Sequence, residues 1–578
     1  MSKPTIDQKN IKTLFSDKKS DFLIPDYQRP YAWGEKECLT LWDDIFAFAF
    51  PNNDSEAFNV NDEYFLGPIV TFRNDEDKQE IIDGQQRLTT LMLLLRAFYA
   101  KYGSMQSEKA KKTAHSIEQC LWKTDEFGDP DKNQLKINSE VATDSDRDEF
   151  LEILKTGSAD GMKSRYAVNY RLFQKKISEF QNSYPDFFSY FPIRILNNCI
   201  LLTIEAESQD TALRIFSTLN DRGLPLSDAD IFKAQFYKFY SNLGEKDNFI
   251  KKWKDLEVLC NDIFHPITGT PMDELFTRYM YYLRAKQGLK RSTTEALRKF
   301  YEHDSYALLK SKETMENLVD LANFWNDVLN QDSDRFTEKE LRRLFVLQYA
   351  PNGMWSYFLS VYYLSYRDAE GNLEEAPLIE FLNRMIGFIW AYAVVNPGVN
   401  ALRTPVYAEM VNVVNHMPVT FSGFKLDRGR VETALKNYRF TNNRAITKSM
   451  VTWWAFTDDT QPLLSLENAF EIEHIYAKSR YEKEGSLADP ANLESLGNKA
   501  LLEKRINIRA SDYHFVDKKK YYNGYTNAKD QFKEGTKNKE LREIANSKKD
   551  FTEADIIERH DAMIDGFMKY LEQYDLLK

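Results

Sequence analysis

Cysteine is scarce in this chain, and its distribution excludes two kinds of structure. Only four cysteines occur among 578 residues, and no two of them form a CxxC pair. A disulfide framework or a zinc site needs cysteines at close and regular spacings. We therefore expect reduced, buried thiols in a cytoplasmic protein at the four positions, which are Cys38, Cys120, Cys199 and Cys260.

Long apolar runs are also missing. The first ten residues, MSKPTIDQKN, are polar and contain no apolar signal core. The longest apolar run, MIGFIWAYAVV at 385–395, is too short to span a bilayer and lies between Arg384 and Pro397. We predict that this run forms a core helix and that the protein has no membrane partner.

Neither the total charge nor a standard phosphate loop marks this chain as a binder of nucleic acid or nucleotide. The net charge is −11, and a Walker A loop, GxxxxGK followed by Ser or Thr, occurs nowhere. The distribution of charge is more informative than its sum. Residues 499–549 hold 14 Lys and Arg against 7 Asp and Glu, so this part is the better candidate for a surface that faces phosphates.

The chain is long enough for about two to four domains. The first domain is expected at 1–240. Its first hundred residues mix the strand-like segments FLIP, YFLGPIVTF and EIID with turns and one strong helix, which is typical of an α/β domain. The pattern from about 101 to 240 is mostly helical, with one further strand candidate, CILLTIEA at 199–206. Residues 241–420 have amphipathic, aromatic-rich patterns that predict a mostly helical middle domain. In residues 421–578, strand-like pieces precede Lys- and Asn-rich helical pieces. The predicted fold class is therefore mixed α/β and α, with several domains.

The segment IIDGQQRLTT places an acid, a glycine, two amides and an arginine before a helical pattern. Gly84 permits a tight turn or the close approach of a ligand. Arg87 falls on the first helical turn, where free backbone N–H groups favour an anion. Gln85 and Gln86 suit contacts with a base or a sugar, and Asp83 suits a metal or a ribose hydroxyl. These residues form a candidate nucleotide-phosphate site; the alternative is a corner in which Arg87 pairs with Asp83.

A second polar segment, IPDYQRPYAW, is framed by prolines, which fix an extended backbone. It carries Tyr27, Gln28, Arg29 and Trp33, and aromatic rings interleaved with arginine suit stacking on bases. We predict that these four residues sense DNA. The alternative, which fits Tyr31 and Trp33 slightly better, is an edge strand whose aromatic rings belong to the core.

A third segment, LNDRG, precedes a helix start at Ser227 and Asp230 that resembles a capping box. The loop offers Asn220 and Arg222 next to a glycine, a composition that an ordinary turn does not require. We therefore add Asn220 and Arg222 to the candidate nucleotide site, although such loops also arise by chance.

The C-terminal part has the sharper pattern, FEIEHIY followed by LGNKALLEKRIN. Glu473 and His474 end an alternating stretch, and Asn498 and Asn507 follow after a loop. Phosphodiester cleavage needs a base for water and a cation for the scissile phosphate, and an imidazole is the obvious base near pH 7. An acid beside it and an amide oxygen from a following helix can hold one Mg²⁺-like ion, which takes few protein ligands. Asn498 would brace the loop that carries the histidine.

A run of lysines follows this pattern. We predict that Lys518, Lys519 and Lys520 contact the DNA backbone, where each would add affinity and salt dependence without reading sequence. The alternative is a solvated charge run with no partner.

The first 240 residues resemble the N-terminal family of GmrSD-type restriction proteins. The resemblance rests on four blocks in order, IPDYQRPYAW, YFLGPIV, IIDGQQRLTTL and one that begins IFSTLNDRG. It implies a ParB/sulfiredoxin-like fold, binding and hydrolysis of a nucleotide (NTPase activity) at Asp83 to Arg87, and sensing of modified DNA. In relatives that sense phosphorothioate DNA the YQR block takes part, which points here to Tyr27, Gln28 and Arg29.

The C-terminal pattern resembles the HNH, or ββα-metal, nuclease motif in the version found at the C-terminus of GmrSD-type proteins. The resemblance implies that His474 is the general base, that Glu473 and Asn507 are metal ligands, and that Asn498 is structural. Relatives commonly have proline where Ala477 lies here, so this departure concerns the conformation of the loop more than the chemistry.

The first hypothesis is a nucleotide-regulated, divalent-metal-dependent DNA endonuclease or nickase of the modification-dependent restriction type, acting in phage defence. Its cofactors would be Mg²⁺ or Mn²⁺ and an NTP, with GTP as one candidate, and its partners modified phage DNA and further copies of the chain in a homo-oligomer. The second hypothesis is a ParB-like nucleotide-dependent DNA clamp with an inactive nuclease remnant, which Ala477 and the net acidity favour. The third is one partner of a toxin-like pair that cleaves RNA.

Overall fold

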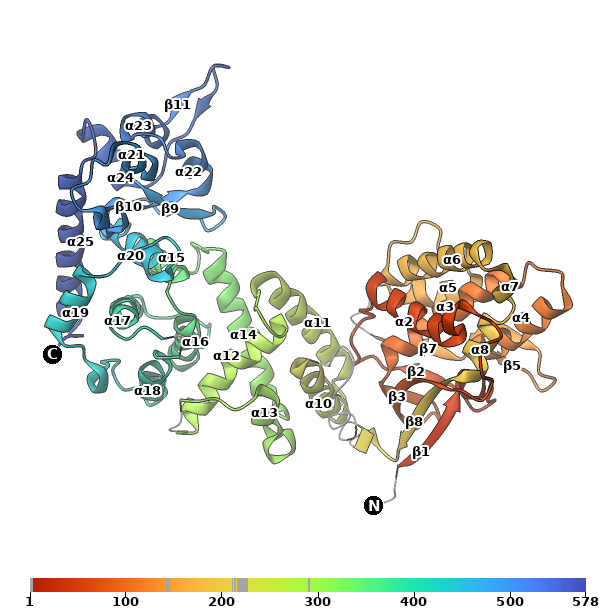
Figure 1. Cartoon of the computed structure of the whole chain (residues 1–578). Helices are drawn as coiled ribbons and strands as arrows, with labels where there is room; N and C mark the ends of the chain where they lie inside the picture. The colour runs from red at the N-terminus through yellow and green to blue at the C-terminus, as the bar shows by residue number, and fades with distance from the viewer. Residues whose placement is uncertain are drawn as a thin grey trace. The chain divides into compact units, whose positions relative to one another are not determined.

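The computed structural model divides into two compact units, residues 1–254 (unit 1) and 255–578 (unit 2). Figure 1 gives the order of the elements along the chain. The structure describes residues 4–578 except 142–145, 210, 213–214, 216–226, 290–291 and 399. The segments expected to form a helical middle domain and a C-terminal domain thus lie largely within one compact unit.

A mixed six-stranded sheet organises unit 1, with strand order β1-β8-β3-β4-β2-β7. Strand β3 is parallel to β8 and antiparallel to β4, and β2 is parallel to both β4 and β7. The bounds are β1 (Thr5–Asn10), β2 (Phe22–Ile24), β3 (Tyr64–Arg73), β4 (Gln79–Asp83), β7 (Ile137–Ser139) and β8 (Cys199–Ala206). Four of these strands coincide with predicted strand segments, whereas β1 and β7 were not predicted.

The two faces of this sheet are buried in different clusters, because successive residues of a strand point to opposite sides. Ile69 and Ile81 face the large cluster that the helices build, and Val70 and Ile82 face a smaller cluster. The helices of unit 1 are α1 (Ile11–Ser16), α2 (Glu35–Ala49), α3 (Gln85–Tyr102), α4 (Glu108–Leu121), α5 (Arg147–Thr156), α6 (Arg165–Ser183), α7 (Pro185–Phe188), α8 (Phe191–Asn198) and α10 (Asp228–Asn242). Strands β5 (Trp122–Thr124) and β6 (Pro130–Leu135) form a separate pair.

The first part of unit 2 is helical. Its helices are the end of α11 (Lys246–Ile263), α12 (Pro271–Lys286), α13 (Leu297–Tyr306), α14 (Lys312–Leu329), α15 (Glu338–Gln348), α16 (Met354–Tyr366), α17 (Glu375–Val395) and α18 (Arg403–Val414). Helix α17 contains the longest apolar run and is long and apolar enough to cross a membrane, but 67% of its most apolar window is buried inside the protein. This burial confirms the prediction of a core helix.

In the rest of unit 2, strands β9 (Phe470–His474) and β10 (Lys499–Glu503) form a short antiparallel pair, which helix α22 (Lys504–Ala510) follows directly. The chain between the two strands forms α21 (Lys478–Glu484) and two 3₁₀ turns, η4 (Pro490–Glu494) and η5 (Leu496–Asn498). The remaining elements are α19 (Arg428–Lys436), α20 (Ala445–Ala455), α23 (Phe515–Asn523), β11 (Tyr525–Thr526), β12 (Phe532–Lys533), α24 (Lys539–Ser547) and α25 (Glu553–Gln573).

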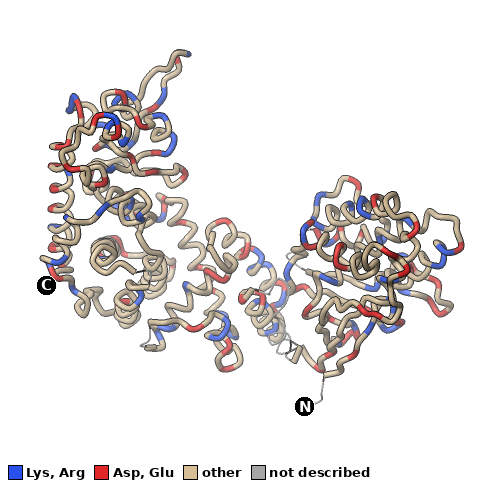
Figure 2. Tube along the Cα trace, in the orientation of Figure 1, with Lys and Arg blue, Asp and Glu red and all other residues tan. Residues whose placement is uncertain are grey.

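Charged residues of both signs are distributed along both units (Figure 2). The four cysteines are buried free thiols, as predicted from their spacing. Taken together, the chain is a multidomain, mixed α/β protein with a small mixed sheet and a large share of helix.

Candidate functional site

Strand β9 places Glu473 and His474 on opposite faces, because neighbouring residues on a strand point to opposite sides. His474 lies on one side, opposite its register partner Lys499 on β10. Glu473 lies on the other side, which it shares with Glu471 two positions earlier. The polar groups around β9 therefore form two sets, one around His474 and one around the two glutamates.

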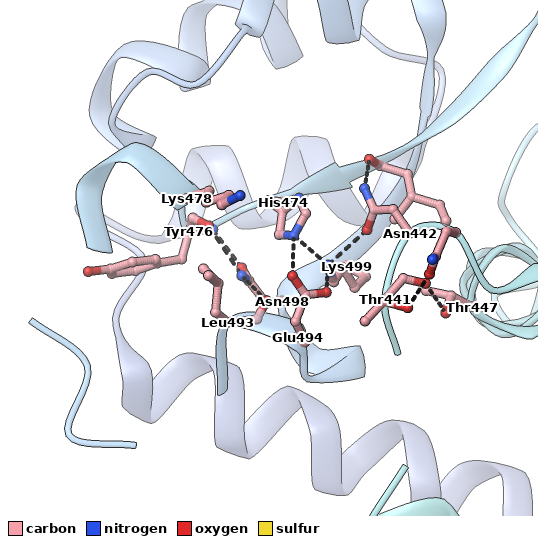
Figure 3. A network of polar contacts seen from close by, with 12 residues as sticks. Thr441, Asn442, Thr447, His474, Tyr476, Lys478, Leu493, Glu494, Asn498 and Lys499 are labelled. Carbon is pink, nitrogen blue, oxygen red and sulfur yellow. Dashed lines mark hydrogen bonds and ion pairs between the residues drawn. The ribbon is translucent and has the colours of Figure 1, made fainter. Parts of the chain in front are cut away.

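The imidazole of His474 is held through Nε2. This nitrogen lies 3.5 Å from Glu494 Oε1 and in close contact with Lys499 Nζ. The Lys499 ammonium donates to Glu494 Oε2 at 2.8 Å and to Asn442 Oδ1 at 2.8 Å (Figure 3). Nε2 is therefore the ring nitrogen of His474 that this pair engages.

The charges of the Glu494–Lys499 pair are set by burial and by their mutual contact. Burial raises the pKa of Glu494, but hydrogen bonds from His474 and Lys499 outweigh it and bring the pKa to about 2. Burial lowers the pKa of Lys499, and its hydrogen bond with Glu494 opposes that effect. Glu494 is therefore a carboxylate at neutral pH and can orient an N–H of His474.

Asn498 fixes the loop that follows His474. Its side chain is fully buried; Nδ2 donates to the carbonyls of Tyr476 at 3.2 Å and Leu493 at 3.0 Å, and Oδ1 accepts from the Tyr476 N–H at 2.7 Å. The carbonyl of Asn498 also accepts from the Ile475 N–H at 3.0 Å. One residue thus satisfies four backbone groups on both sides of the loop, which restricts the position of His474 (Figure 3).

Glu473 is buried in an ion pair that the sequence did not reveal. Its Oε1 accepts from Lys518 Nζ at 2.8 Å and from the hydroxyl of Tyr522, and the two charged side chains are 4% and 1% exposed. Lys518 Nζ also donates to the carbonyl of His474 at 2.6 Å. Burial, and then the charge of Glu473, raise the pKa of Tyr522 well above its ordinary range, so it remains a neutral donor.

The three lysines of the run therefore differ in burial and in their partners. Lys518 is buried on α23 and paired with Glu473, a position that does not fit the expected contact with the DNA backbone. Lys519 is half-buried and donates to the carbonyl of Lys548 at 2.7 Å, whereas Lys520 is exposed beside the ring of Tyr521. Contact with the DNA backbone stays a prediction for Lys519 and Lys520.

Asn507 lies next to Glu471. Its Nδ2 donates to Glu471 Oε2 at 2.9 Å, and Lys504 Nζ lies 3.7 Å from the other oxygen of that carboxylate. His474, Glu473 and Asn507 thus have separate sets of partners, and the structure does not show the expected convergence of the three on one ion. Among the described residues, no group of three His, Cys, Asp or Glu side chains is arranged to hold a metal.

The donor set nevertheless fits a hard divalent ion chemically. Glu471 and Glu473 lie on one face of β9, and Asn507 contacts the first of them from α22. These side chains offer only oxygen ligands, which Mg²⁺ prefers, and such an ion keeps several waters and needs few protein ligands. Glu471 is the residue of this set that the sequence pattern missed, although its spacing of two from Glu473 places both on one face.

The corner between β4 and α3 depends on a glycine. Gly84 has φ of 94°, in the left-handed region that glycine favours, and a Cβ at this position would lie 2.6 Å from Ile69 Cγ2. The N–H of Gly84 donates to Oδ1 of Asp83 at 2.8 Å. Burial raises the pKa of Asp83, while that hydrogen bond and the charge of Arg87 oppose the effect.

Arg87 joins α3 to β3. Its Nη1 donates to the carbonyl of Pro68 at 2.9 Å, and its guanidinium packs against Gly67, where a Cβ would lie 2.9 Å from Nη2. Burial lowers the pKa of Arg87, and the nearby charge of Asp83 opposes it. The YFLGPIV and IIDGQQR blocks are therefore in direct contact.

The two glutamines of the corner hold the YQR segment. Gln85 Nε2 donates to the carbonyl of Arg29 at 2.7 Å, and Gln86 Nε2 donates to that of Pro30 at 3.2 Å. Gln86 Oε1 accepts from the N–H of Ala32 at 2.7 Å. The carboxamides that were expected to contact a nucleotide directly thus bind backbone of the neighbouring block.

The YQR segment itself is packed against the sheet. Gln28 is buried and donates to the carbonyls of Ile81 at 3.2 Å and Ile82 at 3.1 Å, and the hydroxyl of Tyr27, also buried, donates to Glu80 at 3.1 Å. Arg29 is half-buried.

The aromatic residues beyond Arg29 belong to the core, as the alternative hypothesis predicted, but they lie in a loop before α2 and not on an edge strand. Tyr31 stacks on Tyr166 with ring centres 4.8 Å apart, and Trp33 packs against the same cluster. The other predicted members of the nucleotide site, Asn220 and Arg222, lie outside the described residues.

Two protein-family models match the chain. The GmrSD restriction endonuclease N-terminal domain matches residues 11–237, which contain the corner at Gly84. The GmrSD restriction endonuclease C-terminal domain matches residues 428–565, which contain β9, β10 and α22. The chain belongs to the GmrSD restriction endonuclease family. No curated protein matches the chain.

Membership of the GmrSD family makes the chain a restriction-type DNA endonuclease, a hydrolase of phage defence, with DNA as a partner. Within this GmrSD protein, the departure at Ala477 leaves the loop backbone in place. Ala477 has φ of −68°, inside the range that a proline ring imposes, and its side chain is buried. The alanine therefore adopts the backbone angle that the missing proline would fix.

Sequence reasoning missed Glu494 and Lys499, which hold His474 in this GmrSD chain. Lys499 had a partial signal, because it directly follows Asn498, and the register of the hairpin that closes the loop there places it opposite His474. Glu494 had no such signal, since the distance between its carboxylate and the imidazole depends on how the intervening loop folds.

Proposed function

We propose that the chain is a nucleotide-regulated, divalent-metal-dependent DNA endonuclease or nickase of the HNH (ββα-metal) type that acts on modified phage DNA in the cytoplasm. The observation that carries the proposal is the imidazole at the end of β9, held from one side by Glu494 and Lys499 and from the other by the loop that Asn498 braces. The order of two antiparallel strands and a helix with Asn507 supports the same assignment.

In the proposed reaction, His474 is the general base. Its Nε2 side faces the Glu494 carboxylate, which stabilises the imidazolium that forms when Nδ1 takes a proton from the attacking water. Asn498 keeps the ring in place through the Tyr476 and Leu493 backbone. Lys499 holds the Glu494 carboxylate in position by its 2.8 Å contact.

A divalent ion would be held by Glu473 and Asn507, with Glu471 beside them. When bound, Mg²⁺ or Mn²⁺ would offset the charge that develops on the scissile phosphate. The Lys518 ammonium now neutralises Glu473, so the carboxylate would turn toward the ion or share its second oxygen with it. A site that binds the ion only with substrate present fits this arrangement, because phosphate oxygens would complete the coordination.

For the N-terminal domain, we infer a ParB-like fold that binds and hydrolyses an NTP, with GTP as one candidate, at the corner of Asp83, Gly84 and Arg87. The free N–H groups at the start of α3 and the arginine on its first turn support this assignment. Gln85 and Gln86 bond to the backbone of the YQR segment, so a nucleotide at the corner and DNA at that segment would affect each other's binding. A homo-oligomer whose assembly depends on nucleotide is one way to gate cutting.

The test is plasmid nicking by the purified full-length protein with Mg²⁺, on modified and unmodified phage DNA, with and without each NTP. We expect His474→Ala to reduce nicking by about a hundredfold to ten-thousandfold, the contribution typical of a general base, because it removes that base. The matched control is His514→Gln, a histidine of the same part of the chain that is 45% exposed and pairs with Glu484. This control should keep full activity.

Each other outcome has a separate meaning. Equal nicking by wild-type protein and His474→Ala would contradict the assignment of the base. Nucleotide-dependent DNA binding without cutting by any metal would favour a clamp with an inactive nuclease remnant. Cleavage of RNA but not DNA would contradict the proposed substrate.

A further inference from the structure

A separate cavity lies in the helical part of unit 2. It has a volume of about 470 Å³, and its walls come from α12, α14, α15, α16 and the loop after α11. Four aromatic rings contribute to the wall, those of Phe264, Trp325, Trp355 and Tyr357, together with polar side chains. A cavity of this size that combines aromatic rings with convergent polar groups is typical of a small-molecule site.

Arg278 on α12 is the guanidinium group of this cavity. Only 9% of its side chain is exposed, and its Nη2 donates to Glu274 at 2.9 Å. The guanidinium lies over the rings of Trp325 and Phe264, at 4.2 Å and 4.7 Å from their centres. Contacts of this kind use the face of the guanidinium, so its N–H groups remain directed outward in its plane.

The polar atoms of the cavity that lack a partner are all donors. Nε and Nη1 of Arg278 are buried without a hydrogen-bond partner, and so is Nε2 of Gln348 at the end of α15. Among the described lining residues, no buried side-chain acceptor lacks a hydrogen-bond partner. Buried polar groups are nearly always paired, and the strongest partner for a guanidinium is an oxyanion.

We propose that this cavity binds the oxyanion of a small molecule, a phosphate monoester or a carboxylate, with Arg278 and Gln348 as its donors. The aromatic walls receive the rest of the ligand. Glu274 already balances the charge of Arg278, so a ligand with one oxyanion group fits and a polyphosphate is repelled. The site is therefore distinct in chemistry from an NTP site at Gly84.

The test titrates the full-length protein with inorganic phosphate, acetate, adenosine monophosphate and ATP. Tryptophan fluorescence reports binding because Trp325 and Trp355 line the cavity, and calorimetry gives the stoichiometry. We expect saturable binding of a single-oxyanion probe at one site per chain. ATP should bind this cavity at least tenfold more weakly, where binding to the cavity is the part of ATP binding that Arg278 variants reduce. Comparison of phosphate with acetate distinguishes the two oxyanions.

Two variants and a control assign the site. Arg278→Lys keeps the positive charge but removes the planar donors, and should weaken binding at least tenfold. Gln348→Met keeps the size of the side chain and removes the third donor, and should weaken binding severalfold. If Arg278→Lys fails to fold, the binding measured for Gln348→Met tests whether the ligand lies in this cavity. The control is Arg335→Lys, an arginine of the same unit that pairs with Asp327 and does not line the cavity.

Two results would overturn the proposal. The first is the absence of saturable binding of any probe to the wild-type protein, which would mean that water satisfies these donors. The second is equal binding by the wild type, Gln348→Met and any folded Arg278→Lys, which would place the ligand elsewhere.

Discussion

The ion pair between Glu473 and Lys518 is the contact that most changes the interpretation of single residues. In the sequence, Lys518 belongs to a run of three lysines and looks like a surface residue. In the structure it is one half of a buried pair beside strand β9. A pair of this kind stabilises only as a pair, because either charge alone would be left buried without a partner.

Removal of Lys518 should therefore cost far more than removal of a surface lysine. We expect Lys518→Met to lower the free energy of unfolding by about 3–5 kcal/mol, because Glu473 would remain buried without its counter-charge. The measurement is urea unfolding of the purified protein. The double variant Glu473→Gln with Lys518→Met should recover most of this loss, since no charge is then stranded.

The same experiment separates the buried pair from a DNA contact. A surface lysine that only touches phosphate would change the free energy of unfolding by no more than about 0.5 kcal/mol and would mainly alter the salt dependence of DNA binding. That result for Lys518→Met would contradict its burial against Glu473. Lys520→Met is the matched control, since it is exposed in the same helix.

The residues of the nuclease site could be found from sequence only where their signal is local. His474 and Asn498 belong to short patterns with fixed chemistry, so they could be named in advance. Their partners could not, because Glu494 meets His474 only through the fold of a loop, and Lys518 meets Glu473 only through the packing of α23 on β9. The same holds for Gln85 and Gln86, whose partners lie more than fifty residues earlier.

At the level of elements, apolar patterning predicted the buried strands and helices and missed the polar ones. Strands β3, β4 and β8 and helices α3 and α17 carry clear apolar runs and were recognised. Strand β1 has the sequence TIDQKN and is mostly exposed at the edge of the sheet, so no alternation of apolar residues marks it. The short strand β7 is defined by its pairing with β2 and not by its own three residues.

The packing of η5 on α25 gives a prediction at this scale. A Cβ on Gly497 would lie 1.9 Å from the carbonyl oxygen of Ile556 and 2.7 Å from the nitrogen of His560. Since both atoms belong to helical backbone, Gly497→Ala should force the two elements apart and lower the free energy of unfolding by more than about 2 kcal/mol. Thermal unfolding followed by circular dichroism measures the loss.

The control for Gly497 is another glycine of the same part of the chain. Gly485 has φ of 58°, and a Cβ added there would meet no heavy atom within 4 Å, so Gly485→Asn adds a side chain without a clash. We expect it to change stability by less than about 1 kcal/mol, because asparagine tolerates the left-handed region. Equal losses in the two variants would argue against close packing of η5 and α25.

At the scale of the whole molecule, each compact unit has its own apolar clusters, and this division should be visible in unfolding. We expect calorimetry of the full chain to show at least two transitions, because units with separate cores need not unfold together. Gly84→Ala, which introduces a clash with Ile69, should move one transition, and Gly497→Ala should move another. A single transition that both variants shift equally would contradict independent unfolding.

The length and composition of the chain indicated several domains, but they did not indicate the boundary between the two compact units at residues 254 and 255. The helical middle is not a free linker, because hydrogen bonds from side chains to backbone carbonyls join it to the C-terminal part in both directions. Arg342 donates to the carbonyl of Asp459, Ser449 donates to that of Tyr349, and Gln331 donates to that of Leu464. Such long-range contacts have no signature in a single sequence.

These hydrogen bonds between the helical middle and the C-terminal part have a genetic consequence. In a screen for mutants that no longer restrict phage, damage to α14 or α15 would score as loss of cutting although no catalytic atom had changed. Hits from such a screen would spread over much of the second half of the gene, and their density would mark a shared scaffold more than an active centre.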